Sequence, residues 1–325
     1  GSWNNGAVLQ AGAVTWGNGS TGITGTVSAA NSLVGSTTGD SVGSAGVAVL
    51  TNGNYLVRSY SWDNGPTADA GAVTWGNGAI GVKGAVSATN SLVGSHADDA
   101  VGVVAPLVLT NGNYVVLSPS WSLPSTLDVG AATWGNGTTG RTGVVSAANS
   151  LVGSTAADQV GTDGMSIALT NGNYVIGSPN WDNGAVSDTG AATWGNGTTG
   201  VTGTVSAANS LVGTTTEDRV GGSGVTPLTN GNYVVASASW DSGVMADVGA
   251  VTWADGTTGR TGAVSLANSL VGASANDQIG SEFVTPLTNG NYVVASTHWM
   301  NVLAVSAGAV TWGDGTSGTT GVVSA

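Results

Sequence analysis

The hexapeptide Leu-Thr-Asn-Gly-Asn-Tyr occurs five times in this 325-residue chain, at an almost constant interval. Its copies begin at Leu50, Leu109, Leu169, Leu228 and Leu287, so they lie 59, 60, 59 and 59 residues apart. Such a period indicates tandem copies of one structural unit, which cannot bury its apolar face alone and packs against its neighbours. We therefore predict a single repeat domain over residues 1–325.

All twelve tryptophans of the chain stand at one of two fixed positions in the repeat. The first position, within Thr-Trp-Gly-Asn-Gly or a near variant, is held by Trp16, Trp75, Trp134, Trp194, Trp253 and Trp312. The second position is held by Trp3, Trp62, Trp121, Trp181, Trp240 and Trp299. A buried tryptophan covers about 150–250 Å². The repetition therefore favours an architectural role in a core made mostly of alanine and valine.

Each repeat is itself double, because the segments around Leu-Thr-Asn-Gly and Thr-Trp-Gly-Asn-Gly resemble each other. The chain contains eleven such modules of about 30 residues, or about 5.5 units. Asn-Gly between short β-prone runs is the strongest short-range signal for a hairpin with a type I′ turn. We expect one hairpin per module and four strands per unit. An odd number of modules leaves one hairpin without a partner, and an unpaired strand edge invites self-association.

The composition predicts an all-β fold. Only 7% of the residues are charged and 55 are glycine, which disfavours amphipathic helices. In residues 232–240, the alternating positions Tyr233 and Val235 on one face and Val234 and Ala236 on the other are uncharged, as expected for a sheet packed between like sheets. Four short antiparallel strands per unit predict a β-propeller of five or six blades built from 59-residue units. The alternative is a β-solenoid whose coil is the half-unit.

Charge and hydropathy exclude several partners. The formal net charge is −13, and the five basic residues do not cluster, so we expect no nucleic-acid binding. No apolar stretch approaches the roughly 18 residues that a membrane span needs, so we expect no membrane insertion. Cysteine is absent, which excludes disulfides and thiolate metal sites. No charged segment followed by an apolar one opens the chain, so any targeting signal is expected outside these residues.

Motifs that suggest chemistry have simpler explanations here. The segment Gly135-Asn-Gly-Thr-Thr-Gly140 fits the G-x-G-x-x-G pattern of dinucleotide-binding loops. The match is accidental, because strand-like residues follow it where the binding loop needs the start of a helix. Aspartates recur in every long loop, at Asp40, Asp99, Asp158, Asp218 and Asp277, and in the other module at Asp69, Asp128, Asp188 and Asp247. We interpret both series as caps of backbone N–H groups, because each loop has too few oxygens for calcium. We predict no metal site, no cofactor, no catalytic residue and no enzyme activity.

The segment Trp-Asp-Asn-Gly is the one candidate binding motif. It occurs at Trp62-Asp63 and Trp181-Asp182, and as Trp-Asp-Ser-Gly at Trp240-Asp241. An indole ring beside a carboxylate and an amide can stack on a sugar ring while the polar groups take its hydroxyls. Two other copies lack the polar residues, at Ser122 and Met300, so core packing is the leading interpretation and glycan binding the rival.

Taken together, the motifs Leu-Thr-Asn-Gly-Asn-Tyr-Val-Val, Gly-Ala-Val-Thr-Trp-Gly-Asn-Gly-Thr-Thr-Gly and Ala-Asn-Ser-Leu-Val-Gly resemble the tandem repeats of large filamentous-haemagglutinin-like bacterial surface proteins. The resemblance covers essentially the whole chain and implies a β-propeller type of repeat in an exported, adhesin-like protein. We therefore expect a secreted or cell-surface, non-enzymatic structural or adhesive domain. The rivals are a multivalent lectin, in which repeated sites give avidity, and a solenoid that binds ice or a surface through threonine-rich faces.

Overall fold

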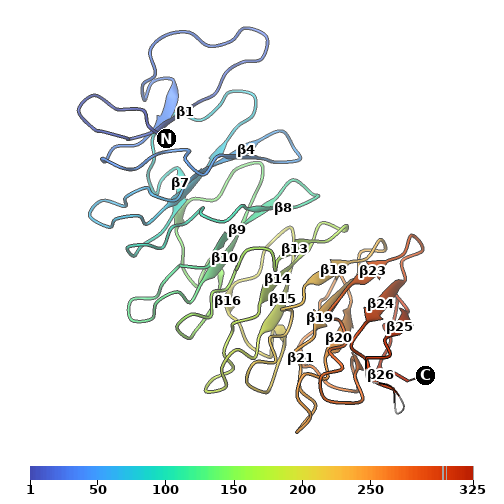
Figure 1. The fold of residues 1–325 in the computed structure, drawn as a ribbon. Helices are drawn as coiled ribbons and strands as arrows, with labels where there is room; N and C mark the ends of the chain where they lie inside the picture. The colour runs from blue at the N-terminus through green and yellow to red at the C-terminus, as the bar shows by residue number, and fades with distance from the viewer. Residues whose placement is uncertain (302–303, 305, 325) are drawn as a thin grey trace. The chain divides into compact units, whose positions relative to one another are not determined.

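The computed structural model describes residues 1–301, 304 and 306–324, and this part of the chain contains strands and turns but no helix. Its 26 short strands form six sheets, so the all-β prediction is confirmed (Figure 1). The chain divides into two compact units. The first comprises Gly1–Val152 and Gly197–Gly203, and the second comprises Gly153–Asn196 and Thr204–Ala325.

Five strand positions recur in each repeat, and we call them the first to the fifth strand. First strands are β3 (Val47–Val49), β8 (Leu107–Val108), β13 (Ile167–Ala168), β18 (Val225–Pro227) and β23 (Val284–Pro286). Second strands are β4 (Tyr55–Ser59), β9 (Tyr114–Ser118), β14 (Tyr174–Ser178), β19 (Tyr233–Ser237) and β24 (Tyr292–Ser296). Third strands are β1 (Ala13–Thr15), β5 (Ala72–Gly76), β10 (Ala131–Gly135), β15 (Ala191–Gly195), β20 (Ala250–Ala254) and β25 (Ala309–Gly313). Fourth strands are β6 (Gly84–Ala85), β11 (Gly143–Val144), β16 (Gly203–Thr204), β21 (Gly262–Ala263) and β26 (Gly321–Val322). Fifth strands are β2 (Ser32–Val34), β7 (Ser91–Val93), β12 (Leu151–Val152), β17 (Ser210–Val212) and β22 (Leu270–Val271).

Each complete sheet combines two repeats. The first, second, third and fifth strands of one repeat pair antiparallel, as in the order β3-β4-β5-β7. The fourth strand of the following repeat then adds to the fifth strand in parallel, as β11 does to β7. In the first unit the sheets are β1-β2-β6, β11-β7-β5-β4-β3 and β12-β10-β9-β8, and in the second they are β13-β14-β15-β17-β21, β18-β19-β20-β22-β26 and β23-β24-β25. The predicted four-stranded unit is therefore present, with an exchanged strand that the sequence pattern did not predict.

The Leu-Thr-Asn-Gly-Asn segment forms the predicted hairpin, but with a different turn. Leu50 N donates to Asn54 O at 2.8 Å, and Gly53 N donates to Leu50 O at 3.0 Å. Within the loop only Gly53 has a positive φ, of 84°, whereas a type I′ turn needs two such residues. The type I′ prediction is therefore wrong. The loop is a three-residue connection that ends on a left-handed glycine, so Asn52 keeps an ordinary backbone and its side chain is free to reach outward.

The Trp-Gly-Asn-Gly segment does not form a second hairpin, contrary to expectation. Gly81 N donates to Asn77 O at 2.7 Å, and Asn77 Oδ1 accepts the N–H groups of Ala79 and Ile80, so the chain turns tightly after β5. The next strand, β6, does not return to β5 and pairs with β2 of the preceding repeat instead. The asparagine side chain satisfies the turn locally, which leaves the next strand available for the neighbouring sheet.

The core lies between consecutive sheets. In the second unit, Leu169, Val175 and Leu211 of one repeat pack with Tyr233 and Trp240 of the next. Strands β9, β14 and β19 are buried at all five positions, as predicted for sheets covered on both faces. Buried hydroxyl pairs join the third and fifth strands, namely Thr74–Ser91, Thr133–Ser150, Thr193–Ser210 and Thr252–Ser269, each at 2.7 Å. These pairs satisfy polar groups that burial would otherwise leave without partners.

Candidate functional site

The three tryptophans of the candidate binding motif lie in the interior. Trp62, Trp181 and Trp240 are 4%, 3% and 5% exposed. Trp62 packs with Leu33 and Val57, and Trp240 lies in the core described above. Their indole Nε1 atoms have no hydrogen-bond acceptor among the described residues, so packing holds the rings in place. The structure thus places these rings in the packed core, and a role for them in sugar stacking stays a prediction.

The aspartates that follow these tryptophans close a short loop. Asp63 Oδ1 accepts Asp69 N at 3.0 Å. In the other two copies, Asp182 accepts Asp188 N and Asp241 accepts Asp247 N, each at 2.8 Å. Each of these carboxylates has one oxygen tied to the backbone of its own loop. We call residues 4–10, 63–69, 122–128, 182–188 and 241–247 the post-Trp loops.

The aspartates of the long loops cap backbone groups, as predicted. Asp40 is fully buried, and its Oδ2 accepts Ser36 N at 2.7 Å and Thr37 N at 2.8 Å, while Oδ1 accepts Asp63 N at 3.0 Å. The same three-donor arrangement occurs at Asp99, Asp158, Asp218 and Asp277, all fully buried. One donor is always the residue after a buried tryptophan. Each carboxylate therefore fixes its own loop to a post-Trp loop.

The side chains of the second aspartate series cap no backbone N–H group among the described residues, contrary to expectation. Asp69, Asp128, Asp188 and Asp247 have φ values of 48°, 54°, 49° and 52°. Aspartate and asparagine tolerate the left-handed backbone better than most non-glycine residues. The residue is selected here for its backbone conformation, which explains why Gln10 and Ser306, with φ of 51° and 52°, replace it in the terminal copies.

Burial raises the pKa of Asp40, Asp99, Asp158 and Asp218 above the ordinary 3.8, and this effect outweighs the backbone donors that lower it. A raised pKa means that the folded chain binds these protons more tightly than the unfolded chain. The resulting stabilisation is complete below about pH 3.8 and is lost as the pH rises through the raised pKa values. Asp255 and Asp314 have lowered pKa values, so the stabilisation that these two carboxylates contribute is lost as the pH falls.

The melting temperature is therefore expected to be higher at about pH 4 than at pH 7, because the pKa is raised at five carboxyls, Asp247 being the fifth, and lowered at two. Differential scanning calorimetry at constant ionic strength measures this dependence. The variant Asp158→Asn, which removes one raised carboxyl, should show a shallower dependence than the parent. A melting temperature that falls on acidification from pH 7 to pH 4 would contradict the expectation.

A clamp of three donors joins consecutive repeats. Gly137 O accepts Asn52 Nδ2 at 2.9 Å, Asn54 Nδ2 at 2.8 Å and Trp75 Nε1 at 2.9 Å, all from the preceding repeat. The clamp recurs on Gly197 O from Asn111, Asn113 and Trp134, on Gly256 O from Asn171, Asn173 and Trp194, and on Gly315 O from Asn230, Asn232 and Trp253. The repeated Asn-Gly-Asn and Trp therefore join successive repeat segments within each unit.

The clamp requires glycine at its acceptor. A Cβ on Gly137 would lie 1.7 Å from Gly112 O, a backbone atom that cannot move aside without disturbing its hairpin. Gly137→Ala is expected to cost about 1–3 kcal/mol of unfolding free energy, the usual range for an overpacked interior. Urea denaturation followed by tryptophan fluorescence measures the change. Gly19→Ala is the matched control, because a Cβ on Gly19 meets nothing within 4 Å, and equal losses in the two variants would contradict the clamp.

The post-Trp loops expose side chains that differ from copy to copy. The fourth and sixth residues after each tryptophan, which we call the loop tips, are exposed in these five copies. They are Ala7 and Leu9, Pro66 and Ala68, Ser125 and Leu127, Ala185 and Ser187, and Val244 and Ala246. Leu9, Leu127 and Val244 are 56%, 70% and 102% exposed. The recurrent residues of these loops hold the backbone, and the variable residues face solvent.

One post-Trp loop borders a polar cavity of about 200 Å³. It is lined by Thr216, Glu217, Ser239, Asp241, Ala246 and Asp247. Burial, followed by the charges of Asp241 and Glu217, raises the pKa of Asp247. Of the predicted site residues, the cavity contains only Asp241. Among the described residues no group of three or more His, Cys, Asp or Glu side chains is arranged to hold a metal ion.

None of the described segments forms a helix that is long and apolar enough to cross a membrane.

A family model described as a repeat of unknown function, DUF5650, matches residues 1–44, 49–103, 108–162, 168–222, 227–281 and 286–325. Five of these segments begin at the last residue of a first strand. The match confirms the predicted tandem repeat. A search of curated proteins finds no relative of the chain. Because the matched segments cover nearly all of its residues, this chain belongs to the DUF5650 repeat family.

Proposed function

We propose that this chain is a non-enzymatic structural and adhesive repeat domain of an exported bacterial surface protein. The resemblance to filamentous-haemagglutinin-like repeats supports the cellular setting. The post-Trp loops support the adhesive role. Their recurrent aspartates are tied to backbone groups, whereas their tips expose apolar side chains such as Leu127 and Val244. A rigid frame that presents several variable tips can bind a surface with avidity that no single weak contact provides.

The test is adhesion of protein-coated beads under flow to epithelial cells, mucin and matrix proteins. The triple variant Leu9→Ser, Leu127→Ser, Val244→Ser removes the three large apolar tips and is expected to reduce bead retention severalfold without lowering the melting temperature. Ile80→Ser, Leu266→Ser, Phe283→Ser is the matched control, because these side chains are also exposed, at 78%, 51% and 71%, but lie outside the loops. Retention no greater than that of albumin-coated beads, or equal loss in both triples, would overturn the proposal.

A second candidate is a carbohydrate-binding lectin, which the polar cavity beside Trp240-Asp241 favours. Its carboxylates and the Ser239 hydroxyl provide the kind of hydrogen-bond acceptors that sugar hydroxyls use. A glycan array with the parent chain and Glu217→Gln tests this function. Binding that Glu217→Gln weakens at an unchanged melting temperature would support a lectin. An array without signal would leave adhesion through the loop tips as the proposed function.

A further inference from the structure

The dipeptide Asn-Gly occurs twelve times in this chain. Its glycine nitrogen can attack Cγ of the asparagine side chain, and glycine has no Cβ to hinder that approach. The new N–Cγ bond closes a five-membered succinimide and the Cγ–Nδ2 bond breaks, so the amide leaves as ammonia with the proton of the glycine N–H. Water then opens the ring and leaves aspartate or isoaspartate. A folded chain prevents this reaction where hydrogen bonds hold the glycine nitrogen and the asparagine side chain.

The Asn-Gly pairs that have a repeat on both sides fall into three groups, and the hairpin pairs are the first. Gly53 N donates to Leu50 O at 3.0 Å, and Asn52 Nδ2 donates to Gly137 O at 2.9 Å. Both reacting groups are therefore held, one by the hairpin and the other by the clamp on the next repeat. The same two bonds recur at Asn111-Gly112, Asn171-Gly172 and Asn230-Gly231.

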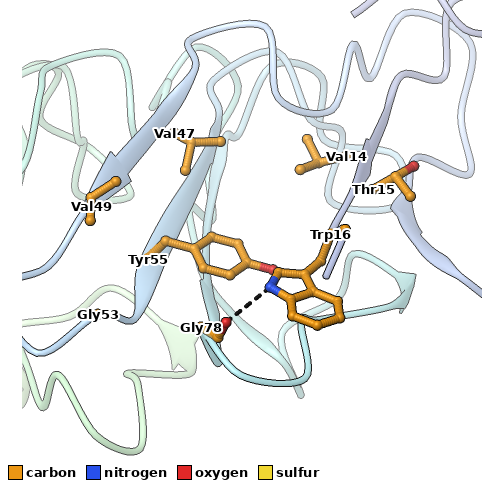
Figure 2. A pocket seen from close by; sticks show the side chains of 9 residues that line it. Val14, Thr15, Trp16, Val47, Val49, Gly53, Tyr55 and Gly78 are labelled. Atoms are coloured by element: carbon orange, nitrogen blue, oxygen red, sulfur yellow. Dashed lines mark hydrogen bonds between the residues drawn. The ribbon is translucent and has the colours of Figure 1, made fainter. Parts of the chain in front are cut away.

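The turn pairs that follow the third strand are held through their peptide groups. Gly78 N donates to Asn54 Oδ1 at 3.0 Å, and Gly78 O accepts Trp16 Nε1 at 3.0 Å, the bond that is dashed in Figure 2. The Asn77 side chain is also engaged, because its Oδ1 accepts two backbone N–H groups of its own turn. Asn136-Gly137 has the same arrangement. Attack at these pairs requires contacts between repeats to break first.

The pairs in the post-Trp loops, Asn64-Gly65 and Asn183-Gly184, lack such protection. Gly65 N and Gly184 N have no acceptor among the described residues, and both glycines are exposed. The second loop is closed by Asn183 N, which donates to Val186 O at 2.9 Å, and by Val186 N, which donates to Asn183 O at 3.2 Å. Breaking these two bonds lets the Asn183 backbone leave its extended bridge and brings Cγ toward the glycine nitrogen, while the clamps stay intact.

Asn183 is held more weakly than Asn64. Asn64 Nδ2 donates to the carbonyl oxygen of the glycine after β7 at 2.9 Å, whereas the distance from Asn183 Nδ2 to the equivalent oxygen after β17 is 3.4 Å. The second distance lies beyond the usual range of an N–H···O bond. The residue after the glycine also differs, because Pro66 fixes its own φ and stiffens the first loop, whereas Ala185 imposes no such constraint.

We propose that Asn183 deamidates spontaneously in the folded chain, before any other Asn-Gly pair that has a repeat on both sides. The product places a carboxylate in a loop that already contains Asp182 and Asp188, and it removes the side-chain donor to Gly213 O. Isoaspartate also lengthens the backbone by one carbon atom, which shifts the register of the bridge to Val186. Both products therefore loosen this post-Trp loop.

Incubation of the folded chain in a mildly alkaline buffer made with oxygen-18 water, followed by digestion and peptide mass spectrometry, measures conversion at each site. The label enters with the water that opens the ring, so it marks reactions that occurred before digestion. The peptide that contains Asn183 should convert at least severalfold faster than the one with Asn64, and faster still than those with Asn52 and Asn171. In urea, which unfolds the chain, the four sites should react at similar rates.

A matched pair of variants exchanges the residue after the glycine. Ala185→Pro should slow the reaction at Asn183 severalfold, and Pro66→Ala should accelerate it at Asn64, with melting temperatures close to that of the parent. Conversion at Asn183 no faster than at Asn52 in the folded chain would overturn the proposal, and so would a ratio of these two rates that urea leaves unchanged. Earlier conversion at Asn64 would overturn the assignment to Asn183.

Discussion

Replacing Trp240 by alanine is expected to lower the free energy of unfolding by about 3–5 kcal/mol, the range for removal of a large aromatic side chain from a core. The ring is 5% exposed and packs against Leu169, Val175 and Leu211 of the preceding repeat. Its removal leaves a cavity at the junction of two sheets, and such a cavity adds to the cost of the lost packing. Chemical denaturation followed by circular dichroism measures the loss.

Trp312→Ala is the control for Trp240→Ala, because Trp312 is 53% exposed and belongs to the other tryptophan series. Its replacement should change the free energy by less than about 1 kcal/mol, as surface substitutions usually do. A Trp240→Ala protein that unfolds like the parent but no longer adheres to a ligand would contradict the packing role and would revive the interpretation of Trp240-Asp241 as a binding site.

Asp158→Ala is expected to cost about 3–5 kcal/mol, because it removes a fully buried acceptor shared by three part-buried N–H groups, and a donor left without its acceptor costs about 1–3 kcal/mol. The donors are Ser154 N at 2.7 Å, Thr155 N at 2.8 Å and Asp182 N at 3.0 Å. The loss of the desolvation penalty of the carboxylate offsets part of this cost. Thermal and urea unfolding measure the effect, and Asp158→Asn should fall between the variant and the parent because an amide retains one acceptor oxygen.

Asp163→Asn tests whether charge alone accounts for the effect of Asp158. Asp163 lies five residues away in the chain and is exposed, so its replacement removes the same charge without removing a cap. It should leave the melting temperature within about 1 °C, since surface changes are usually within 0.5 kcal/mol. If Asp163→Asn and Asp158→Ala were equally stable, the three-donor cap would not be a major source of stability.

Features decided by local sequence could be predicted. The repeat period, the hairpin at Leu50 to Asn54 and the buried second strands follow from the spacing of Asn-Gly and from alternating apolar residues. The turn type could not be predicted, because Asn-Gly suits both a two-residue loop and a three-residue loop. The pairing of β6 with β2 was also missed, since the choice of a strand partner depends on which neighbouring edge is open in space.

In the candidate site, too, features decided by local sequence could be predicted and those decided by distant contacts could not. The capping aspartates could be predicted because a carboxylate in a glycine-rich loop has few other uses. The clamp on Gly137 O could not, because its acceptor is a backbone carbonyl, which every residue has, and its donors lie 62 to 85 residues away in the chain. A signal was available in hindsight: both asparagines of Asn-Gly-Asn recur in every copy, although only one of them is needed for a turn.

The exchanged fourth strand couples each repeat to both of its neighbours. Melting of a repeat removes its fourth strand from the sheet before it, as loss of β11 would leave β7 with an open edge. Melting of the preceding repeat leaves the fourth strand of the following one without its partner. Unfolding that begins at one repeat should therefore destabilise both adjacent repeats, so the amide hydrogens of neighbouring repeats should exchange together rather than repeat by repeat.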